Sequence, residues 1–150
     1  MDSLPFWILT VAYAAHILEE YVLDWRKWVY ETSGLTLEWT EFFTANFAVI
    51  ILGIACSATG FEYPVFSYMF VALAAINAIF AHLGTTIVKR KFSPGLITSV
   101  LLFIPVCTWA YIIAGEKGIL TVTFILVTSG GGLLIMLFPV TLNLIKRKMR

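Results

Sequence analysis

Five long apolar runs, separated by short polar breaks, dominate the pattern of hydrophobic and polar positions along this chain. Each run is close to the ~20 residues that a transmembrane helix needs. Glycine and proline, which mark loops, occur in the breaks between these runs. The breaks include Gly60, Ser93-Pro94-Gly95 and Gly115-Glu116-Lys117-Gly118. The pattern therefore predicts five transmembrane helices, over residues 4–23, 42–59, 64–88, 95–114 and 119–145.

The first break is longer and more polar than the others, and it is rich in aromatic residues. Trp25, Trp28, Tyr30 and Trp39 lie in this segment, residues 25–40. Tryptophan and tyrosine concentrate at the headgroup level of a bilayer. We therefore expect the segment to lie at the membrane surface and to hold a short interfacial helix.

Composition strengthens the membrane interpretation. The 150 residues are 60% hydrophobic and only 13% charged, whereas soluble domains carry about 25% charged residues. We expect an all-α, polytopic membrane helix bundle that forms a single integral membrane domain over residues 1–150, in the cell membrane and in contact with its lipids. A net charge of +1 gives no reason to expect nucleic acid. Self-association into a homo-oligomer stays open.

Basic residues predict the orientation of the bundle. Clusters follow the first, third and fifth runs, at Arg26-Lys27, Lys89-Arg90-Lys91 and Lys146-Arg147-Lys148. Five spans place all three clusters on one side of the membrane. Because loops rich in lysine and arginine stay in the cytoplasm, we expect the N-terminus outside and the C-terminus inside.

One apolar run contains three ionisable residues. His16-Ile17-Leu18-Glu19-Glu20 lies inside the first predicted span. A charged side chain near the bilayer centre costs about 2.5–3.5 kcal/mol on insertion scales, so such residues usually face a partner, a cavity or an ion. At about 100° per residue, Glu19 and Glu20 flank His16 on one side of the helix. These residues are the first candidates for a functional site.

Other polar residues are expected at the same depth. His16 lies roughly 15 Å before Arg26 along a helix, and His82 lies roughly 10 Å before Lys89. The second span runs the opposite way, so Asn46 joins this layer, with Glu41 near its edge. We therefore predict one polar layer in the cytoplasmic half of the bundle.

This set of side chains suits a metal site. Imidazoles and carboxylates from facing helices ligate metals in helix bundles, and two imidazoles with one or two carboxylates suit zinc or non-haem iron. We expect His16, Glu20 and His82 to bind a divalent metal, zinc in preference to iron. Glu19 would then serve as the catalytic acid or base, although the two glutamates could exchange these roles.

Simpler interpretations need the same residues. Glu19 and Glu20 could end a short first span at the interface, and His16 could be a core histidine with its hydrogen bonds satisfied. A proton relay or a polar substrate cavity would also use these groups. Asn77 lies about 140° from His82 on a straight helix, which favours a helix-packing amide over a place beside the ligands. Asn46, Glu41 and Asn77 are kept as residues that could support the ligands or line a substrate site.

The chain resembles the HXXEE-motif family of small integral membrane proteins. His16-Ile17-Leu18-Glu19-Glu20 is similar to the namesake motif, Asn77 through His82 to a second Asn–His element, and the segment from Lys91 to Thr98 to a Pro-Gly element. The family pattern also has a later histidine. This chain has only two histidines, which shifts weight from a three-imidazole site to the carboxylates.

The resemblance implies a metal-dependent enzyme without naming its substrate. The expected function is a membrane-embedded metal-dependent hydrolase that acts on a lipid or other apolar substrate near the cytoplasmic leaflet. An iron-dependent membrane oxidoreductase is the nearest alternative among enzymes. A transporter or channel that handles protons or metal ions is the alternative of another class.

Overall fold

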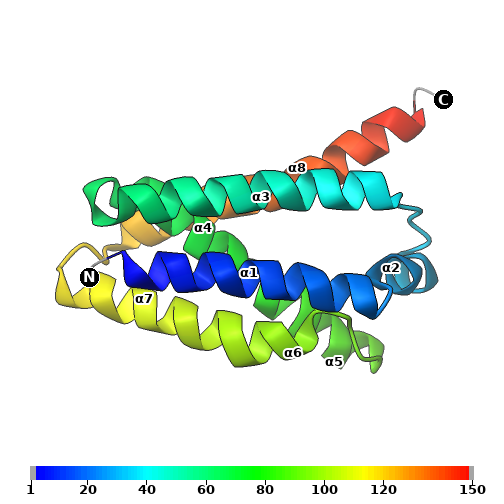
Figure 1. The fold of residues 1–150 in the computed structure, drawn as a ribbon, viewed down its shortest axis with the longest axis horizontal. Coiled ribbons are helices and arrows are strands. Elements are labelled where there is room, and N and C mark those ends of the chain that lie inside the picture. The colour runs from blue at the N-terminus through cyan, green and yellow to red at the C-terminus, as the bar shows by residue number, and fades with distance from the viewer. Residues whose placement is uncertain (1–2, 149–150) are drawn as a thin grey trace.

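The computed structural model describes residues 3–148, which fold into helices joined by short loops, with no strand among these residues. Figure 1 shows long helices packed side by side, with α1 between α3 and α7. Helix α1 spans Leu4–Val22, and Pro5 lies in its first turn, where a missing N–H costs no helical hydrogen bond. Its inner face buries Phe6, Leu9 and Tyr13 in the core.

The chain turns sharply after α1. Asp24 takes a left-handed conformation, with φ of 50°, and its side chain accepts a hydrogen bond from the backbone N–H of Lys27. This N-cap begins α2 (Trp25–Ser33), which is bent by 69° from α1. The predicted short helix in this segment is confirmed. An ion pair from Lys91 to Glu31 ties α2 to the loop after α5, and it lowers the pKa of Glu31 below its usual 4.5.

Like the first, two more of the predicted spans fold as continuous α-helices. Helix α3 (Trp39–Thr59) begins at a capping box formed by Glu38 and Glu41, and a 3-10 turn, η1 (Gly60–Glu62), follows it. Helix α8 (Val122–Lys148) packs along α4. A Cβ atom on Gly132 would lie 2.6 Å from the backbone nitrogen of Leu73, so only glycine permits this approach.

The other two spans each contain a π-helical segment. The third runs as α4 (Pro64–Ile76), η2 (Asn77–Gly84) and α5 (Thr85–Lys89). The fourth runs as α6 (Leu96–Thr98), η3 (Ser99–Phe103) and α7 (Ile104–Glu116). Pro105 lies in the first turn of α7, directly after η3. The two π-segments pack against each other, and η3 also contacts α1.

Within residues 3–148, four helical stretches are long and apolar enough to cross a membrane, namely Trp39–Glu62, Pro64–Lys89, Leu96–Glu116 and Val122–Pro139. The bent pair Leu4–Val22 and Trp25–Ser33 makes a fifth when it is counted as one span. The helical fold and these four spans are thus as predicted from the sequence. Cys56 and Cys107 are buried free thiols.

Candidate metal centre

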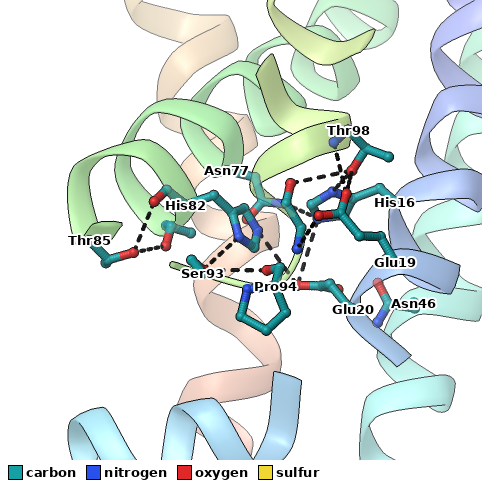
Figure 2. A network of polar contacts seen from close by, with 12 residues as sticks. His16, Glu19, Glu20, Asn46, Asn77, His82, Thr85, Ser93, Pro94 and Thr98 are labelled. Carbon is teal, nitrogen blue, oxygen red and sulfur yellow. Dashed lines mark hydrogen bonds and ion pairs between the residues drawn. The ribbon is translucent and has the colours of Figure 1, made fainter. Parts of the chain in front are cut away.

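His16, Glu20 and His82 converge in the interior of the bundle (Figure 2). His16 and Glu20 come from adjacent turns of α1, and His82 comes from η2. Their relative exposures are 0%, 6% and 1%. Each offers one nitrogen or oxygen atom, and these atoms all lie within 4.8 Å of one another. The structure therefore brings together the three residues that the sequence predicts as ligands.

Glu20 lies between the two imidazoles. Its Oε1 atom is 3.7 Å from Nε2 of His16 and 3.5 Å from Nε2 of His82. The two imidazole rings meet edge to face, with centroids 4.7 Å apart. Phe103 packs against His16 with a centroid separation of 4.7 Å and gives the cluster an apolar wall. The three candidate ligand atoms thus lie close together, with an aromatic ring on one side of the cluster.

The outer nitrogen of each ring is held by a hydroxyl group. Nδ1 of His16 lies 2.8 Å from Oγ1 of Thr98, and Nδ1 of His82 lies 3.1 Å from Oγ of Ser93. Both hydroxyls belong to the segment that leads into the fourth span. A histidine that ligates a metal commonly has such a partner on its second nitrogen, which fixes the orientation of the ring.

Gly95 allows this segment to approach the two rings. Its φ of +94° is in the left-handed region. A Cβ atom there would lie 2.6 Å from Cε1 of His16 and 2.6 Å from Cε1 of His82. Any side chain at position 95 would therefore be strained and would collide with both imidazoles.

Glu19 has contacts quite different from those of Glu20. Its carboxylate accepts hydrogen bonds from the backbone N–H groups of Gly95, Ile97 and Thr98 and from the Thr98 hydroxyl, at 2.6–3.1 Å. These donors form the start of the fourth span, where helical N–H groups lack partners. Glu19 thus joins α1 to that helix start. The acid–base role predicted for it stays a prediction.

Asn77 lies beside the cluster because η2 is not an α-helix. Its Nδ2 atom is 3.1 Å from Nε2 of His16. The expected separation of 140° from His82 assumed 3.6 residues per turn. In a π-helix the hydrogen bonds run from residue i to i+5, so residues five apart stack on one face. The structure therefore places Asn77 beside the candidate ligands, the position that the 140° separation disfavoured.

The two candidates from α3 have different surroundings. Glu41 lies in the first turn of α3, where its carboxylate accepts from the backbone N–H of Glu38 at 3.2 Å, as a helix cap. Asn46 donates from Nδ2 to the carbonyl of Phe42 at 3.1 Å. Asn46 also lines a groove between α1 and α3, together with Ile17.

The geometry of the three candidate ligands fits a small metal ion. Zinc lies about 2.0–2.1 Å from histidine nitrogen, so two ligands at a tetrahedral angle are roughly 3.3–3.4 Å apart. The two nitrogen-to-carboxylate distances, 3.5 and 3.7 Å, are close to that separation. Nε2 of His82 is buried and has no hydrogen-bond partner in the described part of the chain. A buried imidazole nitrogen of this kind is available to a cation.

Sequence reasoning missed the residues that hold the ligands, namely Ser93, Gly95 and Thr98. From the sequence, Ser93-Pro94-Gly95 is interpreted as a break between spans and as part of the Pro-Gly element that the family resemblance indicates, without a contact to the histidines. The available signal was the position of these small polar residues, which follow the third span at the level of both histidines. Their contacts depend on how the loop folds back, which no spacing along the chain specifies.

The fold and the cluster define a class of protein, a helical bundle with long apolar helices and a buried His–Glu centre. The chain belongs to the HXXEE family, described as a protein of unknown function with HXXEE motif, which matches residues 7–110. It is also 36% identical over 107 residues to a Bacillus subtilis (strain 168) protein named "Uncharacterized protein YrkK". The match covers 63% of this chain and 65% of that relative, so the chain spans less than two thirds of the relative's length. No solved structure matches the chain.

Proposed function

We propose that this protein is a membrane-embedded metal-dependent enzyme, with His16, His82 and Glu20 as ligands of one divalent metal ion. The convergence of these three buried side chains carries the proposal. Imidazole nitrogen and carboxylate oxygen are ligands that suit zinc and non-haem iron. Zinc is favoured, since two histidines and one glutamate form a known catalytic zinc set that leaves one position open.

The proposed reaction is hydrolysis. When bound, zinc activates water at neutral pH and polarises carbonyl or phosphoryl groups. Oε1 of Glu20 faces both imidazoles, which leaves Oε2 to hold a proton or a water molecule. Glu19 already accepts four hydrogen bonds, so we assign it to holding the fourth span against α1. In this assignment Glu20 is the carboxylate that contacts the reacting groups.

A groove between α1 and α3 supports a lipid or other apolar substrate. Its volume is about 460 Å³, and its lining is mostly apolar, from Ile17, Phe43, Thr44, Asn46, Phe47 and Ile50. Ile17 and Glu20 are three residues apart, so they lie on the same side of α1. The groove thus runs along the helix face that carries Glu20. We propose that an acyl chain lies in this groove and directs a polar headgroup linkage toward the metal.

The proposed location of the metal centre in the membrane follows from the orientation that the basic clusters suggest. If Arg26-Lys27 and Lys89-Arg90-Lys91 are cytoplasmic, the metal centre lies in the cytoplasmic half of the cell membrane. Figure 1 shows α2 and α5, which carry or adjoin these clusters, at the same end of the bundle. The substrate would then enter from the inner leaflet.

Metal content of the purified protein tests the proposal. We expect about one zinc ion per chain in the parent protein, and its loss in Glu20→Gln and His82→Gln, because each change removes one ligand. Glu62 is an exposed glutamate in η1, so Glu62→Gln is the matched control and should keep the metal. Elemental analysis in detergent measures all four proteins.

Other outcomes would redirect the assignment. A parent protein without metal, or full zinc content in Glu20→Gln, would contradict the metalloenzyme proposal. Retention of iron instead of zinc would favour the oxidoreductase. Zinc or proton uptake by proteoliposomes, with no metal retained after purification, would favour the transporter.

A further inference from the structure

The hydroxyl of Thr98 has a hydrogen-bond arrangement that defines which nitrogen of His16 carries the hydrogen. Oγ1 of Thr98 lies 2.6 Å from Oε2 of Glu19 and 3.3 Å from the carbonyl oxygen of Gly95. Both neighbours accept hydrogen bonds, and the hydroxyl has a single hydrogen to donate. Oγ1 therefore acts as the acceptor toward Nδ1 of His16, which must carry a hydrogen.

The opposite side of His16 agrees with this assignment. Nδ2 of Asn77 lies 3.1 Å from Nε2 of His16, and an amide nitrogen can only donate. A neutral imidazole has one donor nitrogen and one acceptor nitrogen. Nε2 of His16 is then the acceptor, and it takes the hydrogen bond from Asn77.

Ser93 has the same relation to His82. Its Oγ atom donates to the carbonyl oxygen of Pro94 at 3.3 Å, which leaves a lone pair for Nδ1–H of His82 at 3.1 Å. Nε2 of His82 then carries no hydrogen and faces Oε1 of Glu20 at 3.5 Å. Figure 2 shows the two hydroxyls on the outer sides of the two rings.

We propose that Thr98 and Ser93 hold both histidines as the Nδ1–H tautomer, with Glu19 acting through Thr98. Before any cation arrives, the Nε2 lone pair of His82 then faces Oε1 of Glu20, and that of His16 accepts from Asn77, a hydrogen bond that a bound cation would replace. Glu19, Thr98 and Ser93 are positioning residues in this account. The inference goes beyond the proposed function, since it applies whether the cation is a metal ion or a proton.

The tautomers can be measured directly, because the chain has only two histidines. Nitrogen NMR of metal-free protein in detergent, labelled with ¹⁵N in the imidazole rings, distinguishes Nδ1–H from Nε2–H. Spectra of His16→Gln and His82→Gln assign the two rings. We expect both rings of the parent protein to show Nδ1–H.

Hydroxyl variants test the cause. Thr98→Val should mix the tautomers of His16 and leave His82 unchanged, and Thr98→Ser should restore the parent spectrum. Ser93→Ala should affect His82 in the same way. Thr108→Val is the matched control, because the hydroxyl of Thr108 is exposed and bonds only within its own helix.

Zinc titration gives a second, independent readout. Loss of an outer partner of a ligating histidine typically costs 10–100-fold in metal affinity, so Thr98→Val should lose about that much. An Nε2–H signal from either ring of the parent protein would overturn the inference. So would an unchanged His16 signal in Thr98→Val. A parent protein that binds no zinc would contradict only the metalloenzyme, since the tautomers are measured without metal.

Discussion

Gly95 links the positions of the two imidazoles. Its backbone lies against both rings, and its N–H donates to Oε1 of Glu19 at 3.0 Å. The residue therefore sets the distance between α1, η2 and the start of the fourth span. A single backbone position determines how closely the ligands of the candidate centre approach.

Gly95→Ala is expected to displace the histidines. The substitution adds the cost of a left-handed conformation, about 1–2 kcal/mol, to the cost of overpacking, about 1–3 kcal/mol. Gly118→Ala isolates the first cost, because Gly118 has a φ of +70° and open space where the Cβ atom would lie. The melting temperature in thermal unfolding and the zinc content should both fall further in Gly95→Ala than in Gly118→Ala. Equal effects in the two variants would contradict the close packing of Gly95 on the rings.

The sequence predicted the meeting of the candidate ligand residues better than the contacts of the residues around them. His16 and Glu20 are one helical turn apart, and His82 shares their depth, so simple helix geometry predicts that they meet. Thr98 and Ser93 contact the rings only because the loop between spans folds back between them. That conformation depends on the tertiary contacts of Glu19, which no local pattern reports.

Among the helices, η2 determines the position of His82. A π-helix forms when one extra residue is accommodated within a helix whose flanking turns are fixed by packing. Here the preceding helix α4 is fixed by a buried face that includes Tyr68, Phe70 and Leu73. The extra residue lets Asn77 and His82 share one side of the span.

Deleting one exposed residue from η2 should therefore be tolerated. Without Phe80, which is 67% exposed, the segment could continue as an α-helix with Asn77 and His82 four residues apart. Four residues turn about 400°, so both side chains stay on one face. The deletion should keep the zinc content and the Nδ1–H signal of His82.

Deletion from a regular helix gives the control. Removing Ala14, which is exposed on α1, should rotate Phe6 and Leu9 by about 100° relative to His16 and prevent folding. Both deletions are compared with Phe80→Ala by size-exclusion chromatography, which reports whether the protein folds, and by zinc content. Loss of zinc from the Phe80 deletion, but not from Phe80→Ala, would show that the π-segment itself is required.

The apolar pattern predicted the helices closely, and their irregularities hardly at all. The predicted run 64–88 ends one residue before the observed span Pro64–Lys89, and 95–114 begins one residue before and ends two residues before Leu96–Glu116. The length and hydropathy of each run suffice to predict the spans, since the hydrocarbon core of the bilayer requires an apolar helix of a set length. The π-segments and the bend at Asp24 arise from packing and a left-handed cap, which the apolar pattern does not contain.

For the molecule as a whole, both ends of the bundle have a distinct character. Figure 1 places the N-terminus and the α7–α8 loop at one end, and α2, α5 and the end of α8 at the other. The lysines and arginines of the sequence concentrate at the end formed by α2, α5 and the end of α8. The arrangement supports, as a proposal, five spans with the N-terminus outside.

Cysteine labelling tests this orientation. In a background with Cys56 and Cys107 replaced by alanine, a membrane-impermeant maleimide added to intact cells should label Ser3→Cys and Lys117→Cys. Arg90→Cys should react only after the membrane is opened, because positive residues favour the cytoplasmic side. Labelling of Ser3→Cys only after opening the membrane would contradict the orientation.

The order of the polar groups along the chain has a consequence for biosynthesis. His16, Glu20 and His82 all leave the ribosome before Ser93 and Thr98, the hydroxyls that hold the rings. A nascent chain with three spans therefore carries every ligand in unrestrained form. Only arrival of the fourth span fixes the rings, so tight cation binding would appear late in synthesis and would mark chains that have assembled correctly.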